Sequence, residues 1–145
     1  MKPVRIQNSN EVVNHVNGQK KLRRYKILVI DDDQDITTSF KETLENNGSF
    51  SVHTYNDPRQ ALSKFEAGLY DLLLLDIRMP YLNGFELYRE MKEIDYEAKV
   101  CFITAYETYY EQLKKDFPKL NVSCFIKKPV HPDDLIRRII EELES

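Results

Sequence analysis

The chain has 145 residues, which fits one domain, and its apolar and charged fractions of 41% and 31% exclude disorder throughout. The first 25 residues hold six basic residues and one acidic residue, whereas the net charge is −3. We therefore expect a basic leader over residues 1–24, flexible or partly helical, before a domain over residues 25–145. The leader lacks a signal-peptide apolar segment, and runs such as Leu72–Leu75 are too short to span a membrane, so we expect a cytoplasmic location.

Strand and helix patterns alternate from residue 25 onward. Short apolar or alternating runs predict five strands, at Lys26–Ile30, Phe50–Thr54, Asp71–Asp76, Val100–Thr104 and Val122–Ile126. Helical spacing and helix-ending residues predict five helices, at Ile36–Leu44, Asp57–Gly68, Asn83–Asp95, Tyr109–Phe117 and from Pro132 onward. Strands separated by helices pair in parallel, and right-handed crossovers place helices on both faces. The prediction is a doubly wound (βα)5 domain of the α/β class.

Two cysteines, Cys101 and Cys124, lie inside predicted strands. We expect both to be buried thiols, because a disulfide is unusual in a reducing compartment. With no histidine nearby, they also form a poor zinc site.

Chemically reactive side chains follow four of the five predicted strands. Asp31–Asp33 follow the first strand, Asp76 ends the third, Thr104 ends the fourth, and Lys127 and Lys128 follow the fifth. In an open parallel sheet, ligands bind at the carboxyl ends of the strands, so these groups are expected to meet on one rim. The two lysines cannot both point into the rim, because neighbouring strand residues face opposite ways.

The acidic part of this rim calls for a cation. Two carboxylates about 4 Å apart repel by roughly 4 kcal/mol at an effective dielectric of 20, so they protonate or recruit a cation. Hard oxygen ligands suit Mg²⁺, and an aspartate is an established covalent acceptor of phosphate. The pattern therefore indicates phosphoryl transfer at a metal site.

Four segments in this order resemble the receiver domain of two-component response regulators. They are ILVIDDDQDI, YDLLLLDIRMPYLNGFEL, VCFITAYE and CFIKKPV. The resemblance runs from about Lys26 to the C-terminus and leaves only the leader outside it. It implies a flavodoxin-like sheet with strand order 2-1-3-4-5.

The resemblance also implies the residues of a metal and phosphoacceptor site. Asp76 would accept the phosphoryl group. Asp32 and Asp76 would bind Mg²⁺ directly, with Mn²⁺ as a substitute, and Asp31 would act through water. The backbone carbonyl of Arg78 would complete the protein ligands, and its side chain would flank the path of hydrolytic water.

Further roles implied by the resemblance concern the switch. Thr104 would hydrogen-bond the phosphoryl group, Lys128 would form an ion pair with it, and Phe125 would be the aromatic switch residue. A cis peptide bond would precede Pro129. Tyr106 would also flank the water path, and such a large side chain predicts slow loss of the phosphoryl group.

The implied partner is a sensor histidine kinase or a histidine phosphotransfer protein. The chain would not be a conventional enzyme, although it would catalyse its own phosphorylation and dephosphorylation. Phosphorylation would alter the surface of the fourth helix, fifth strand and fifth helix, where an unidentified protein effector or a second copy could bind. We expect no membrane contact and no direct nucleic-acid binding by the receiver.

Two alternatives stay open. Asp31-x-Asp33 after a strand also resembles the first motif of haloacid-dehalogenase-type phosphatases, although Asp35 replaces the expected Thr or Val and Asp76 would have no role. An unphosphorylated pseudo-receiver scaffold is the other alternative. An EF-hand is dismissed, because Ile36 stands where its loop requires glycine.

Overall fold

The computed structural model describes residues 4–5, 12–16, 19–105, 107–116, 118 and 124–145. Its main sheet has five parallel strands in the order β5-β4-β6-β7-β8, with bounds β4 (Tyr25–Ile30), β5 (Phe50–Tyr55), β6 (Leu72–Asp76), β7 (Lys99–Thr104) and β8 (Cys124–Lys127). In chain order this is 2-1-3-4-5, so the predicted α/β fold and strand order are confirmed. Every residue of the central strand β6 is buried, as its run of leucines predicts.

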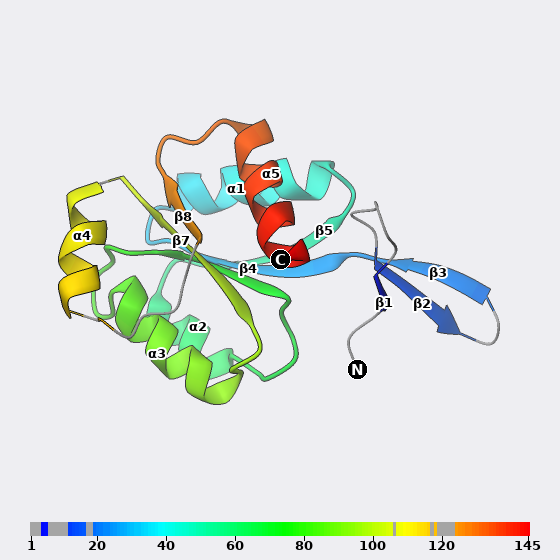
Figure 1. The fold of residues 1–145 in the computed structure, drawn as a ribbon, viewed down its shortest axis with the longest axis horizontal. Coiled ribbons are helices and arrows are strands. Elements are labelled where there is room, and N and C mark those ends of the chain that lie inside the picture. The colour runs from blue at the N-terminus through cyan, green and yellow to red at the C-terminus, as the bar shows by residue number, and fades with distance from the viewer. Residues whose placement is uncertain (1–3, 6–11, 17–18, 106, 117, 119–123) are drawn as a thin grey trace.

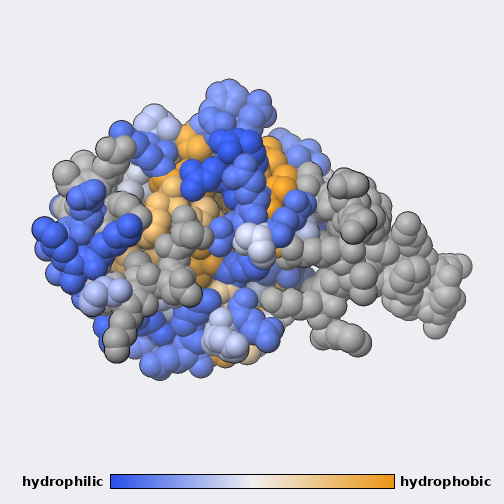
Figure 2. Space-filling model, viewed as in Figure 1, coloured by the Kyte–Doolittle hydropathy of each residue, from blue (hydrophilic) through white to orange (hydrophobic). Residues whose placement is uncertain are grey.

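Five helices cover the two faces of this sheet (Figure 1), namely α1 (Gln34–Asn46), α2 (Pro58–Lys64), α3 (Gly84–Ile94), α4 (Glu107–Asp116) and α5 (Pro132–Glu144). One core cluster joins α1 and α5 to the sheet, and a second joins α2 and α3 to its other face. Figure 2 shows hydrophilic residues over the outer surfaces of the helices and hydrophobic residues between them. The helices therefore leave the carboxyl ends of the strands as the place where polar side chains gather.

Local sequence explains where these helices begin. The side chain of Asp33 accepts a hydrogen bond from the Asp35 N–H at the start of α1, and Asp57 does the same for Arg59 at the start of α2. Helix α3 begins with a capping box, in which Asn83 and Glu86 each accept a backbone N–H of the other. Helix α2 ends at Lys64, earlier than the predicted end at residue 68.

The leader contains strands. β1 (Val4–Arg5), β2 (Val12–Val16) and β3 (Gln19–Arg23) form an antiparallel sheet in the order β1-β2-β3 (Figure 1). The expected leader was flexible or partly helical, whereas its described parts are extended. Charge suggested the leader, whereas the valines of β2 are typical of a strand. The division into a leader and a receiver at residue 24 stays a prediction.

The two cysteines form a disulfide, so the prediction of free thiols was wrong. Cys101 on β7 and Cys124 on β8 are register partners with Cα atoms 4.6 Å apart, within disulfide range. Both are buried on strands, as expected. Their pairing depends on strand register, which composition and compartment arguments do not reveal. Separately, no helix among the described residues is long and apolar enough to cross a membrane.

Candidate functional site

The predicted rim residues lie together at the carboxyl ends of the parallel strands. Asp31 follows β4, Asp76 ends β6 and Thr104 ends β7, and these three are 1%, 5% and 5% exposed. Because β4, β6 and β7 are neighbours in the sheet, segments far apart in the chain meet here. Three polar side chains buried at one edge are costly unless they are paired, so the edge is a candidate site.

Lys128 is the cation of this edge. Its Nζ lies 2.6 Å from Oδ2 of Asp31 and 3.5 Å from Oδ1 of Asp76. Its neighbour Lys127 is exposed, so Lys128 is the lysine that enters the rim. The backbone fixes this position, because the Lys128 N–H donates to the carbonyl of Thr104 at 2.8 Å, and the peptide bond between Lys128 and Pro129 is cis.

Three carboxylates gather at this edge, and two of them, those of Asp31 and Asp76, contact the ammonium group of Lys128. Carboxylate oxygens of Asp31, Asp32 and Asp76 lie within 4.8 Å of one another, with Asp32 exposed at the mouth of the site. Burial, followed by the charge of Asp31, raises the pKa of Asp76 from 3.8 to about 7. The cluster therefore disfavours the ionised form of Asp76 when no further cation is present.

The other two members of the buried group are shifted for related reasons. Burial raises the pKa of Asp31 despite its ion pair with Lys128. Burial alone would lower the pKa of Lys128, but hydrogen bonding to Asp31 and the charge of Asp76 raise it above its usual value. Lys128 is therefore charged at neutral pH and offsets only part of the negative charge. Oxygen ligands in this arrangement fit a hard divalent cation such as Mg²⁺.

Asn56 supports the acidic pair Asp31 and Asp32, and the sequence did not predict this role. Its Nδ2 donates to the backbone carbonyl of Asp31 at 2.8 Å and to Oγ1 of Thr37 at 3.0 Å. Thr37 in turn donates to the carbonyl of Gln34 at 3.1 Å. These bonds tie the segment after β5 to the segment after β4. Nothing in the sequence near Asn56 signals this role, because the contact spans 25 residues.

Gly84 lets the segment after β6 pass close to the phosphoacceptor candidate. Its N–H donates to the carbonyl of Ile77 at 2.8 Å. A Cβ on Gly84 would lie 2.4 Å from the backbone oxygen of Asp76, closer than real Cβ atoms approach. Any larger residue at this position would therefore push the backbone that carries Asp76.

A depression of about 650 Å³ adjoins the site, with Asp32 in its lining. The guanidinium of Arg59 lies 3.5 Å over the ring of Tyr81 and pairs with Asp57 at 2.8 Å. Tyr81 itself has a positive φ of 75° and is exposed. This depression was not predicted, because it needs the loops after β5 and β6 to be side by side.

The remaining predicted site residues are Phe125, Arg78 and Tyr106. The half-buried ring of Phe125 packs 5.4 Å from the ring of Phe102, on the strand pair β7–β8. The side chain of Arg78 is exposed. Tyr106, the predicted shield of the water path, lies outside the described residues.

Comparisons with known proteins agree with this arrangement. Residues 27–140 match the family described as response regulator receiver domain. The chain is 32% identical to the transcriptional regulatory protein DltR of Streptococcus agalactiae (strain NEM316), over 79% of this chain and 50% of DltR. It is also 32% identical to the response regulator receiver protein CpdR of Brucella abortus (strain 2308), over 79% and 92%. The chain spans about half the length of DltR.

A solved structure shows the same likeness in three dimensions. A CheY-like receiver domain protein from Methanospirillum hungatei JF-1 is 30% identical, with a TM-score of 0.75 over 84% of this chain and 95% of that one.

Proposed function

This chain belongs to the response regulator receiver domains of two-component signal transduction, and on that premise we propose that Asp76 accepts a phosphoryl group beside a bound Mg²⁺. A single observation carries the proposal. Three carboxylates, two of them buried, lie within 4.8 Å of one another, and the two buried ones contact Lys128. Burying such a charge surplus costs free energy that a purely structural edge would avoid.

The residues around Asp76 would share the work of transfer. Carboxylate oxygens of Asp32 and Asp76 and the carbonyl of Arg78 would hold the Mg²⁺, with Asp31 acting through water. The cation would neutralise charge on the incoming phosphoryl group. Asp76 attacks phosphorus only when ionised, and Lys128 favours that form. The leaving group departs with the bonding electron pair as the Asp76–phosphorus bond forms.

A switch would follow from the new charge. Thr104 would hydrogen-bond a phosphoryl oxygen and Lys128 would pair with another. We propose that Phe125 then repacks and alters the surface of α4, β8 and α5, a shift between two populations. The large side chains of Arg78 and Tyr106 would slow loss of the phosphoryl group.

The phosphoryl donor would be a sensor histidine kinase or a histidine phosphotransfer protein, and the setting would be cytoplasmic. The chain itself would catalyse its phosphorylation and dephosphorylation while lacking the substrate turnover of a conventional enzyme. Its altered surface would serve a protein effector or a second copy of the chain. The output function of DltR and similar regulators is not assigned to this chain, because the match covers only half of DltR.

The phosphatase alternative is weaker on geometry. Asp31 would be its nucleophile, yet this carboxylate is 1% exposed and lies 2.6 Å from Lys128. Asp76 would be left without a role although it shares the same cluster.

Incubation with acetyl phosphate tests the proposal. We expect intact-mass spectrometry to show one phosphoryl addition that requires Mg²⁺ and is absent in Asp76→Asn. Asp116→Asn is the matched control, because this carboxylate is exposed at the end of α4 and does not belong to the carboxylate cluster. No addition in the wild type would favour the scaffold alternative. Phosphate release that survives Asp76→Asn but is lost in Asp31→Asn would favour the phosphatase.

A further inference from the structure

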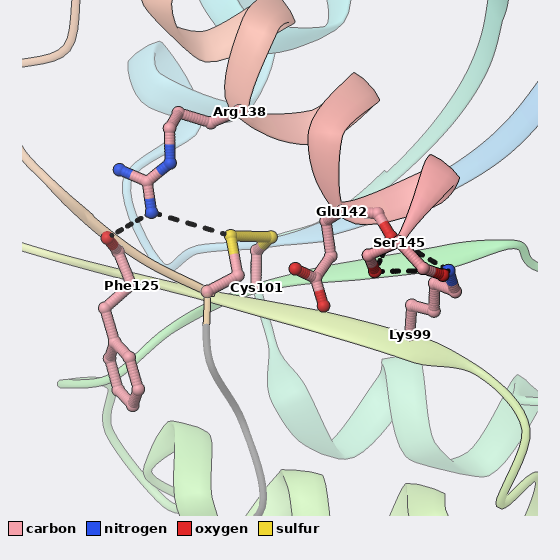
Figure 3. Close-up of a disulfide and its surroundings, with 7 residues drawn as sticks. Lys99, Cys101, Phe125, Arg138, Glu142 and Ser145 are labelled. Atoms are coloured by element: carbon pink, nitrogen blue, oxygen red, sulfur yellow. Dashed lines mark hydrogen bonds between the residues drawn. A yellow bond between two sulfur atoms is a disulfide. The ribbon is translucent and has the colours of Figure 1, made fainter.

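We propose that Cys101 and Cys124 form a reversible dithiol–disulfide site, a point of redox modification that sets the mobility of β8. The inference is independent of phosphorylation at Asp76. It begins from the disulfide that joins β7 to β8 beneath α5 (Figure 3). The two cysteines are 0% and 2% exposed and belong to the same core cluster as Leu135 and Ile139 of α5.

The position of the disulfide in the sheet allows it to restrain the edge strand β8. β8 has four residues and lies at the edge of the sheet, so β7 is its neighbour among the described strands. The disulfide adds a covalent link to that pairing at its first register pair. The same two strands carry Thr104 and Phe125. A change at the sulfur atoms is therefore transmitted to an edge strand of the sheet.

Two oppositely charged side chains flank the sulfur atoms. Nη2 of Arg138 lies 3.9 Å from Sγ of Cys124 and donates to the carbonyl of Phe125 at 2.9 Å. A carboxylate oxygen of Glu142 lies within 4.8 Å of both sulfur atoms. Figure 3 shows the disulfide between these two residues of α5. A cation stabilises a thiolate and a carboxylate destabilises it. Arg138 therefore favours the reduced state, and Glu142 favours the oxidised state.

The chemistry needs a dithiol as the reductant. Its thiolate attacks Sγ of Cys101 and forms a mixed disulfide, while the Cys101–Cys124 bond breaks and its electron pair leaves on Cys124. The second thiolate of the reductant attacks the reductant's own sulfur and releases Cys101. The two protons of the dithiol pass to solvent or to the new thiols, and the reductant ends as a cyclic disulfide. The reverse sequence restores the bond.

The same atoms make a metal site a poor explanation. Cys101, Cys124 and Glu142 place two sulfur atoms and one oxygen within 4.8 Å. However, the two sulfur atoms are bonded to each other, and a disulfide offers a metal no thiolate ligand.

Equilibration in redox buffer tests the proposal. The folded protein is incubated with reduced and oxidised dithiothreitol in varied ratio, quenched with acid and alkylated. Intact-mass spectrometry then measures the dithiol fraction. The wild type is expected to reach the same dithiol fraction from either starting state. At a pH high enough to ionise the thiols, Arg138→Gln should shift the equilibrium constant about tenfold toward the disulfide, and Glu142→Gln about tenfold toward the dithiol, the effect of one pKa unit. Arg137→Gln and Glu141→Gln, exposed neighbours on α5, should leave it unchanged.

Hydrogen exchange supplies the second measurement. Reduction should speed exchange of the amides in β8 and leave those of β6 unchanged. Reduction that occurs only after unfolding would overturn the proposal, as would a stoichiometric zinc in place of the bond. Equal shifts in both charge variants would overturn the assignment of Arg138 and Glu142. Unaltered exchange in β8 would overturn the link to its mobility.

Discussion

Replacing Asp76 with asparagine should stabilise the protein when no divalent cation is present. Burial and the charge of Asp31 raise the pKa of Asp76 from 3.8 to about 7. Folding therefore takes up a proton between these values, and stability contributed by this group is lost as pH rises from about 4 to about 7. A difference of about 3 pKa units at roughly 1.4 kcal/mol each sets an upper limit of about 4 kcal/mol.

Urea unfolding in EDTA measures this effect at pH 5 and at pH 8. We expect Asp76→Asn to exceed the wild type by about 2–4 kcal/mol at pH 8 and by less at pH 5, because the wild-type carboxyl is then mostly protonated. Adding Mg²⁺ should stabilise the wild type and not the variant. Asp116→Asn is the control. Equal stability of Asp76→Asn and the wild type at pH 8 would refute the reasoning from crowded carboxylates.

Three further substitutions probe the site. Lys128→Gln should raise Mg²⁺ affinity several-fold by calorimetry, because it removes a competing cation, and should slow phosphorylation by acetyl phosphate at least about tenfold; unchanged affinity would contradict this. Asn56→Ala should weaken Mg²⁺ binding about tenfold by freeing the backbone of the acidic pair, and Asn46→Ala, at an exposed position, should not. Gly84→Ala should cost about 1–3 kcal/mol in urea unfolding, whereas Ser63→Ala should stay within about 0.5 kcal/mol; a neutral Gly84→Ala would refute the close approach.

The sequence located the rim because its signal is local. A run such as Leu72–Leu75 is typical of a buried parallel strand, and the first ionisable residue after such a strand lies near its carboxyl end. Helix starts were also local, since Asp57 and Asn83 act as caps within three residues of themselves. Helix ends were predicted less accurately than helix starts. Helix α2 ends at Lys64, before Gly68, the residue that suggested its end.

Contacts between two segments that are distant in the chain could not be predicted from the sequence. The hydrogen bond from Asn56 to Asp31 joins two loops, and the Cys101–Cys124 bond follows from the register of β7 and β8. Neither leaves a trace in spacing or composition. The strands of the leader were not predicted for a different reason, because the basic residues around β2 outnumber its few apolar residues.

The central claim is tested most directly by locating the phosphoryl group on the chain. After incubation with acetyl phosphate and Mg²⁺, borohydride reduces an acyl phosphate to an alcohol, which marks the modified aspartate for peptide mass spectrometry. The account predicts that the mark falls on Asp76 alone. A mark on Asp31 with Asp76 unmodified would contradict it and favour a phosphatase.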